Sequence, residues 1–567
     1  MIAIFLACGF LGIGYSSISN ISLDMTGTAE LDRQTGIYIT NIVDGVNANS
    51  SIIHTYYQTY MDSTVTLDSS DLTSTVSFQI TIYNGTSSKQ QFAGVVYDSS
   101  FYDNADIVYE LSGLNVSDIV TPGNSVTFTI TFKYKSGLST ITNNELNSYL
   151  NFKFEEIVEY TPVPADITGL IPVVIDNDGT VTTISSSNPN WFNYDNKMWA
   201  NAVLVKTSGT NTRTYYQSNN DVEVEKDDIL AYFVWIPRYS YKIWTTGVSS
   251  AGQEQEIDIK FVDTSTKETG TQVGEYRTHP AFTFGNTELN GFWVGKFENS
   301  AVSTSTCYTS PSYDNCNNSN IEPRILPSVS ALGYQVLYYG FLTSLKFAGG
   351  SLNNNTVTFS GDSTYGLNST ANTHLLKNRD WGAMAYLSHS KYGINGKIRS
   401  NRNLTNSNLI ETGCASPSET TTTSTTDCTY EYGTQTSYPQ SSTGNISGVF
   451  DMSGGMTEYV MGNYNSNPGS STYTIFNSAF FTNSSNYVDI YTISDVNNCT
   501  IATCGGHALS ETYNWYGSAK TFITSSKPWF TRGGHITSAG TSAEFYYSTL
   551  VGGHGYQVGF RTVLFGE

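Results

Sequence analysis

Six cysteines in the second half of the chain are the residues with the clearest capacity for chemistry. They form three local couples, separated by 9, 14 and 5 positions: Cys307 and Cys316, Cys414 and Cys428, Cys499 and Cys504. Each couple lies in a stretch rich in Ser, Thr, Asn and Gly, where a disulfide would close a loop and stabilise the fold by about 2–3 kcal/mol. In an exported chain such couples are typically oxidised. We therefore expect three loop-closing disulfides.

The last couple also has a spacing that suits zinc. Cys499, Cys504 and His507 stand in the sequence CTIATCGGH. A structural zinc site uses such side chains but needs four ligands, and no fourth lies close in the sequence. We favour the disulfide and keep zinc as the alternative. The seventh cysteine, Cys8, stands in an apolar run that fits a lipidation signal poorly.

The composition excludes two classes of partner. The chain has 567 residues, a formal net charge of −21, 13% charged residues and 13% aromatic residues. Binding of nucleic acid requires clustered Lys and Arg, and so does docking on anionic lipids, so we expect neither partner. The aromatic content is too high for a disordered chain. The composition is typical of a folded extracellular protein, and we expect one that is bacterial and either secreted or anchored at the cell surface.

The first 17 residues predict a targeting segment. Residues 1–15 are almost wholly apolar. A secretory signal needs roughly 7–15 such residues, whereas a spanning helix needs about 20. We interpret residues 1–17 as a signal peptide or membrane anchor, and as the one segment that would meet a membrane. A buried first strand is the alternative.

Residues 18–160 show the alternation of a half-buried antiparallel sheet. In residues 76–82 and 126–134 every second side chain is apolar and the others are mostly Thr, Ser or Lys. Asn84-Gly85 predicts a hairpin turn after the first of these strands, and residues 121–124 predict the turn before the second. The pattern predicts an all-β sandwich that resembles the Ig-like modules of bacterial surface proteins.

A proline-rich connector at residues 161–165 separates this sandwich from a larger domain, residues 166–567. Ile229–Pro237 is a continuous apolar run, which is typical of a strand buried on both faces. Residues 329–348 and 374–391 have apolar side chains at helical spacing. Asp176-Asn177-Asp178-Gly179 favours a hairpin turn rather than a calcium loop, because Ser187 stands where such a loop has Glu.

Four segments of this second domain resemble, in the same order, motifs of the formylglycine-generating enzymes (the sulfatase-modifying-factor superfamily). Residues 378–383 (NRDWGA) are similar to the family's EAEWEYAAR helix, and residues 445–460 (NISGVFDMSGGMTEYV) to its NxxGLYDMxGNVWEW. Residues 530–534 (FTRGG) resemble its RGG strand and residues 559–561 its terminal GFR. The resemblance covers roughly the last 340 residues. It implies an α+β, C-type-lectin-like fold with two helices and long loops.

Ten of the matched residues are expected to build the scaffold. They are Asp380, Trp381, Asn445, Asp451, Glu458, Arg532, Gly533, Gly534, Phe560 and Arg561. A buried guanidinium needs a carboxylate, so Glu458 could pair with Arg561, or Asp451 with Arg532. The glycine pairs at 454–455 and 533–534 permit positive φ and close backbone approach.

The residues that carry the family's activity are missing. Its redox-active cysteine pair lies between RGG and GFR, and residues 535–558 of this chain contain no cysteine. Without a thiolate there is neither cysteine oxidation nor copper(I) ligation by sulfur, so we expect no catalytic residues and no cofactor. Gly455 and Thr457 replace the family's Asn and Trp, which leaves a structural calcium open. Six histidines of this domain show no HxxxH spacing, and whether any of them binds a metal is left unassigned: His279, His374, His389, His507, His535 and His554.

The segment between RGG and GFR instead favours recognition. Its amphipathic side chains are candidate ligand-binding residues: His535, Glu544, Tyr546, Tyr547, His554, Tyr556 and Gln557. Tyrosine offers a large contact area with few torsions to freeze. The same superfamily includes variable receptor-binding proteins that diversify this segment. Phe545 and one of its Tyr neighbours are expected to pack in the core, because strand side chains alternate.

We therefore expect a non-catalytic, lectin-like head that binds a protein or glycan at a surface. One alternative is a metal-dependent oxidase related to formylglycine-generating enzymes, with His and carboxylate ligands. A second alternative is a structural component of a surface layer or fimbria.

Overall fold

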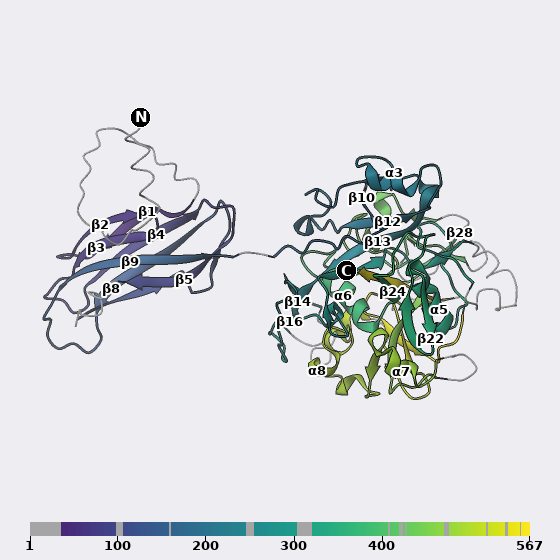
Figure 1. The fold of residues 1–567 in the computed structure, drawn as a ribbon. Coiled ribbons are helices and arrows are strands. Elements are labelled where there is room, and N and C mark those ends of the chain that lie inside the picture. The colour runs from purple at the N-terminus through teal and green to yellow at the C-terminus, as the bar shows by residue number, and fades with distance from the viewer. Residues whose placement is uncertain are drawn as a thin grey trace. The chain divides into compact units, whose positions relative to one another are not determined.

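The computed structural model describes residues 36–97, 106–157, 160–244, 254–302, 320–405, 409–418, 423–425, 428–469, 476–517, 520–538, 542–555 and 557–566. The expected targeting segment 1–17 with Cys8, the couple Cys307–Cys316, and Tyr556 lie outside these residues. The chain divides into two compact units, Met1–Glu159 and Tyr160–Glu567. In both units more residues lie in strands than in helices (Figure 1), which agrees with the expectation of a multidomain chain rich in β-structure.

The first unit contains two antiparallel sheets. One has the strand order β1-β4-β8-β6, with bounds Ile37–Val46, Thr75–Asn84, Ser125–Tyr134 and Ile107–Ser112. The other has the order β2-β3-β9-β5-β7, with bounds Ser51–Tyr57, Tyr60–Thr66, Glu145–Glu156, Gln90–Tyr97 and Ile119–Val120. One apolar cluster contains side chains from both sheets, so they pack face to face as a sandwich.

The expected alternation is present in β4. Val76, Phe78, Ile80 and Ile82 are fully buried, while the residues between them lie on the other face of the strand. β8 shows the same pattern from Phe128 onward. Every second side chain of β4 and β8 therefore enters the apolar cluster. The two strands also lie at the centre of their sheet, between β1 and β6.

The expected hairpin at Asn84-Gly85 is wrong. β4 ends at Asn84, and the chain then enters the other sheet at β5 instead of turning back. The Asn84 side chain is buried, where it donates to the carbonyls of Ser88 and Val120 and accepts from the Thr86 amide. A buried amide satisfied by three backbone groups stabilises a wide connection, and the dipeptide alone does not encode this environment. The turn at residues 121–124 does form, with Gly123 at φ +73°.

Two larger sheets organise the second unit. The first has the order β11-β10-β12-β13-β19-β35-β24, with bounds Val181–Thr183, Ile171–Ile175, Asn201–Val205, Ile229–Pro237, Gly291–Gly295, Thr562–Gly566 and Ala371–Leu375. The second has the order β31-β30-β32-β33, with β34 paired to β30; the bounds are Asp489–Tyr491, Thr457–Tyr464, Trp529–Arg532, Tyr547–Leu550 and Val558–Phe560. β13 has the bounds expected from the sequence, and all nine of its residues are buried.

Six smaller sheets are found in the described residues of this unit. They are β15-β14-β16 (Asp258–Phe261, Tyr239–Lys242, Arg277–Thr278), β17-β18 (Thr283–Phe284, Thr287–Glu288), β20-β21 (Ser300–Ala301, Pro323–Arg324), β22-β23 (Gly350–Asn353, Thr356–Phe359), β26-β25-β28 (Leu409–Ile410, Asn403–Thr405, Thr423–Thr425) and β27-β29 (Cys414–Ala415, Tyr430–Glu431). The turn expected at residues 176–179 joins β10 to β11 as an antiparallel hairpin.

The two expected helices form, but both are shorter than their apolar patterns. α5 spans Leu337–Leu345 and α6 spans Asn378–Ser388. The pattern before α6 belongs to β24, because Ala371–Leu375 pairs with β35. α6 begins where the Asp380 carboxylate accepts the Lys377 amide, as in a capping box. Further α-helices within the described residues are α3 (Arg213–Ser218), α7 (Phe480–Asn483) and α8 (Ile501–Cys504).

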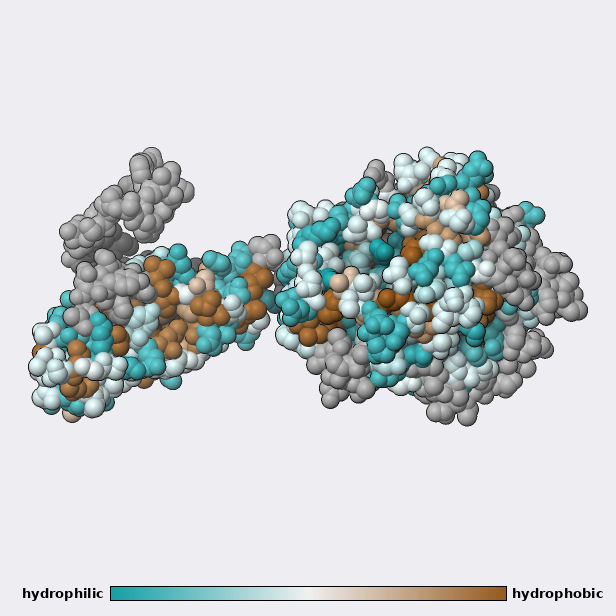
Figure 2. Space-filling model, turned by 90° about the horizontal axis from the view of Figure 1, so that it is seen from below, coloured by the Kyte–Doolittle hydropathy of each residue, from teal (hydrophilic) through white to brown (hydrophobic). Residues whose placement is uncertain are grey.

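No helix within the described residues is long and apolar enough to cross a bilayer. Figure 2 shows apolar residues interspersed with polar ones on the surface of both units.

Candidate functional site

The four motif segments converge in the second unit. β30 runs antiparallel to β32, with Glu458 opposite Arg532, and parallel to β34, with Glu458 opposite Gly559. The indole of Trp381, on α6, lies 5.8 Å from the Arg532 guanidinium. Segments up to about 180 positions apart in the sequence therefore share one neighbourhood, because sheet pairing brings three of them together and α6 packs beside them.

An ion pair inside this neighbourhood joins β30 to the start of β35. Arg561 donates to both carboxylate oxygens of Glu458, at 2.7 and 3.1 Å. It also donates to the carbonyls of Gly295 and Phe450 at 2.8 and 2.9 Å. Both charged side chains are buried, so their attraction and these extra bonds offset the cost of desolvation. Of the two expected pairings, this one is present.

The other expected pair, Asp451 with Arg532, does not form. Asp451 accepts the Gly413 amide and the Asn401 side-chain amide. Arg532 donates to the carbonyls of His507 and Ala508 and lies 5.8 Å from the Tyr547 ring. Carbonyl oxygens and aromatic faces, rather than a carboxylate, surround its guanidinium, and its buried Nε has no hydrogen-bond partner among the described residues. Burial lowers the pKa of Arg532 to about 10, so it remains a cation at neutral pH.

Sequence analysis missed a buried acid, Glu298. Its Oε1 accepts the Met456 amide at 2.9 Å. Burial and the negative charges of Glu458 and Asp451 raise the pKa of Glu298 well above its usual value. Burial and these neighbouring charges therefore favour the protonated form of the Glu298 carboxyl.

Sequence analysis also missed a buried base, Lys296. Its ammonium donates to Asn201, to the Ile446 carbonyl and to the Gly448 carbonyl at 2.6–2.9 Å. Burial lowers the pKa of Lys296 well below its usual value. A sequence signal existed for both residues, since Lys296 and Glu298 follow directly on the five buried residues of β19. A charged residue there implies internal partners.

The glycine pairs have the expected backbone conformation. Gly454, Gly455, Gly533 and Gly534 have φ between +65° and +78°. A Cβ on Gly455 would lie 2.5 Å from Oε1 of Glu298. The glycine at the position where the resemblance implies Asn therefore makes room for the buried acid.

The remaining scaffold residues lie in turns or in the core. Asn445 accepts the Ser447 amide at 2.8 Å and donates to the Lys197 carbonyl, which stabilises a loop. Phe560 is buried in an apolar cluster with Phe341, on α5. Burial acts to raise the pKa of Asp380, but the charge of Lys377 and a bond to His374 outweigh it and lower that pKa to about 2.

Three of the candidate ligand-binding residues are interior. Glu544, Tyr546 and Tyr547 are 0, 8 and 1% exposed, so they offer little or no surface to a ligand. The Glu544 carbonyl accepts the Trp381 indole at 2.7 Å, which fixes this stretch beneath α6. Phe545 is buried as expected, but both Tyr neighbours are buried as well. The alternation argument does not apply here, because residues 543–546 form a turn before β33 begins at Tyr547.

The partly accessible candidates stand near the two ends of the segment. His535 follows the RGG motif, and its imidazole contacts the Thr537 hydroxyl at 2.8 Å. Burial, with a smaller effect from Arg402, lowers the pKa of His535. His554 and Gln557 are half-buried, and the Gln557 carbonyl accepts the Thr457 amide at 2.8 Å. The seventh candidate, Tyr556, lies outside the described residues.

Two of the expected disulfides are present. Cys414 is bonded to Cys428 and Cys499 to Cys504. The sulfurs of the last couple are thus bonded to each other, and His507 contacts the Tyr491 hydroxyl at 2.5 Å, so the zinc alternative is not realised. The two disulfides are compatible with an extracellular protein.

The described part of the chain shows no cluster of side chains that could hold a metal ion. Among those residues, no three His, Cys, Asp or Glu side chains are grouped as metal ligands. His389 packs on Trp515 and Phe545, whereas His279 packs on Tyr239 and Tyr241. These two histidines therefore lie in aromatic surroundings.

Comparison with known proteins assigns this chain to no family. No family model matches the sequence, and no curated protein is significantly similar to it. The fold and the buried charge network define a two-unit, mainly β protein with disulfides in its second unit.

Proposed function

We propose that this chain is an exported bacterial surface protein whose second unit is a non-catalytic, C-type-lectin-like head that binds a protein or glycan ligand, carried on an Ig-like sandwich. The observation that carries the proposal is the segment at residues 535–558. Buried arginines, Arg532 and Arg561, hold the strands at its two ends, and its middle is packed beneath α6. The described side chains near these fixed points would bind a ligand at little entropic cost.

Chemistry at this segment favours binding over oxidation. The segment has no cysteine, and Cys499 and Cys504 are bonded to each other. A nucleophilic oxidation would need a free thiolate. His535, His554 and Gln557 instead offer imidazole and amide groups that donate and accept hydrogen bonds.

Binding of the whole protein to arrays of host and bacterial glycans and surface proteins tests this function. We expect at least one specific ligand, and we expect a variant with His535→Ala, His554→Ala and Gln557→Ala to weaken it about tenfold or more. Tyr215→Ala is the matched control, because Tyr215 is an exposed aromatic residue on α3, outside the segment. Arrays without any specific signal, or equal binding by the triple variant, would argue against the proposal.

A further inference from the structure

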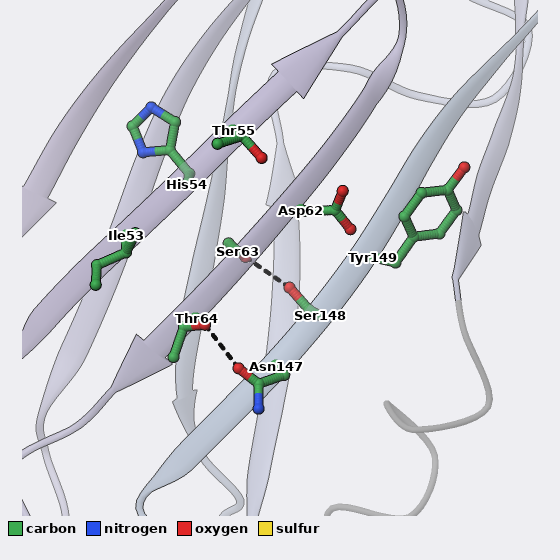
Figure 3. A pocket seen from close by; sticks show the side chains of 9 residues that line it. All are labelled: Ile53, His54, Thr55, Asp62, Ser63, Thr64, Asn147, Ser148 and Tyr149. Carbon is green, nitrogen blue, oxygen red and sulfur yellow. Dashed lines mark hydrogen bonds between the residues drawn. The ribbon is translucent and has the colours of Figure 1, made fainter. Parts of the chain in front are cut away.

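A shallow groove lies on the outer face of the five-stranded sheet of the first unit. Its volume is about 330 Å³. That volume is at the lower end of the range for small-molecule sites, roughly 300–1,000 Å³. Strands β2, β3 and β9 supply its lining: Ile53, His54, Thr55, Asp62, Ser63, Thr64, Asn147, Ser148 and Tyr149 (Figure 3).

Two cross-strand rows of side chains form the walls of the groove. Thr55, Asp62 and Tyr149 stand opposite one another in the strand register and form one row. Ile53, Thr64 and Asn147 form the other, about 7 Å away because the rows are two residues apart along the strands.

The floor lies between these rows. Ser63 and Ser148 are buried and bonded to each other at 2.7 Å, so their side chains face the interior and leave the outer side of the floor open.

The walls carry neutral and acidic hydrogen-bonding groups beside an aromatic ring. Asp62 makes no hydrogen bond or ion pair within the described part of the chain, so both its oxygens can accept. Asn147 accepts the Thr64 hydroxyl at 2.6 Å, which leaves its amide nitrogen free to donate outward. The Tyr149 ring is held in place by Tyr60, with 5.6 Å between the ring centroids.

The groove disfavours anions. Its one basic side chain, His54, packs edge-on against Phe78 in the opposite sheet and lies 3.4 Å from the carboxylate of Asp44, on β1. Asp62 would repel a phosphate or sulfate, since no cation in the lining offsets its charge.

The groove also disfavours an extended peptide. β3 lies between β2 and β9, and β9 lies between β3 and β5, so two of the three lining strands have both edges paired. A peptide that adds a strand needs an unpaired sheet edge, which among the three lining strands only β2 has, and the groove runs across the strands rather than along that edge.

We propose that this groove binds a neutral glycan. Asp62 and Asn147 are planar groups that accept from and donate to adjacent hydroxyls of one sugar, while Tyr149 packs against its C–H face. The site is independent of the function proposed for the second unit.

Binding of the whole protein to an array of defined neutral and anionic oligosaccharides tests the proposal. The neutral oligosaccharide with the strongest signal is then titrated against Asp62→Asn and Tyr149→Ala. We expect each variant to weaken binding about tenfold or more. Glu145→Gln and Asn151→Ala are the matched controls, since both residues lie on the outer face of β9 beyond the groove, and we expect them to bind as the wild type does. Thermal unfolding of every variant checks the fold.

Three results would overturn the proposal. The first is an array on which only anionic glycans bind, or none. The second is neutral-glycan binding that Asp62→Asn and Tyr149→Ala leave unchanged, which would place the site in the second unit and leave the function proposed there intact. If Tyr149→Ala unfolds the first unit, Asp62→Asn together with Asn147→Ala decides the question, and wild-type binding by that pair would count against the groove.

Discussion

Arg561 and Glu458 form a bidentate ion pair, with hydrogen bonds of 2.7 and 3.1 Å, in the interior of the second unit. The pair connects β30 to the residue before β35, and β35 lies in the larger sheet. It therefore links the two main sheets of the unit. Two carbonyls accept further hydrogen bonds from the guanidinium, so each of its nitrogens and both oxygens of Glu458 have a partner.

Loss of this pair is expected to be severe. Arg561→Met would leave Glu458 buried and unpaired near Glu298 and should lower the free energy of unfolding by about 3–5 kcal/mol. Urea unfolding followed by tryptophan fluorescence measures this, because all eight tryptophans lie in the second unit. Lys260→Met is the matched control: Lys260 is bonded to Glu268 at 2.6 Å, but its side chain is 50% exposed. We expect a loss below about 1 kcal/mol there, and equal losses would contradict the account.

Glu298 is expected to make the second unit less stable at alkaline pH. Its pKa is raised by burial and by Glu458 and Asp451, so the folded state holds a proton that the unfolded state releases. Stability from this proton is complete below the unfolded pKa, about 4.3, and declines as the pH rises toward the folded pKa. Glu298→Gln imitates the protonated acid and should flatten the decline in stability as the pH rises above the unfolded pKa.

Urea midpoints across this pH range provide the test. Glu275→Gln is the control, because Glu275 is an exposed acid of the same unit. A slope that Glu298→Gln shares with the wild type would mean that Glu298 is ionised in the folded protein.

His507 is expected to destabilise the second unit in acid. Burial lowers the pKa of His507 to about 4 from the usual 6.5. Its contribution is therefore present above about pH 6.5 and is lost as the pH falls toward 4, by up to about 3 kcal/mol. His507→Asn should be less stable at neutral pH but should lose less on acidification. Urea unfolding of the wild type and of His507→Asn near pH 6.5 and near pH 4 shows whether their stabilities converge in acid. Equal losses of stability on acidification would rule out His507 as the cause of the acid sensitivity.

The disulfides are expected to stabilise their loops unequally. Cys414–Cys428 closes 14 positions and Cys499–Cys504 closes 5, so the simple entropy estimate gives about 3 and 2 kcal/mol. Peptide mapping without reduction should recover both links. The paired variants Cys414→Ser with Cys428→Ser, and Cys499→Ser with Cys504→Ser, should unfold at lower urea, the first more so. Free thiols at Cys499 or Cys504 in the native protein would reopen the possibility of cysteine chemistry.

Local patterns predicted the strands and the turns at residues 121–124 and 176–179, but not the connection that follows Asn84. β13 has its predicted bounds because nine successive apolar residues require burial on both faces. Asn84-Gly85 was predicted to form a hairpin turn, but no such turn forms there. The preference of this dipeptide for a turn is outweighed by three hydrogen bonds of the buried Asn84 side chain to backbone groups. Such tertiary partners lie up to 36 positions away and leave no local signature.

The interior of the candidate site was predicted only in part. Spacing suggested an arginine–carboxylate pair but could not choose between two pairings, since strand register decides which groups meet. Glu544 was expected to bind a ligand as one of the amphipathic side chains of its segment, yet its stretch is fixed beneath Trp381. The groove at Asp62 was not predicted from the sequence. Its two rows of side chains come from three separate strands, β2, β3 and β9, and form only through the pairing register of these strands.

The most direct test of the central claim, that the second unit recognises a ligand without altering it, is calorimetric titration of the whole protein with its strongest array ligand, followed by mass analysis of that ligand. We predict saturable binding to the second unit, weakened by the triple variant at His535, His554 and Gln557, with the ligand mass unchanged after incubation. A changed ligand mass, or stoichiometric iron or copper in the native protein, would contradict the claim and favour an oxidase.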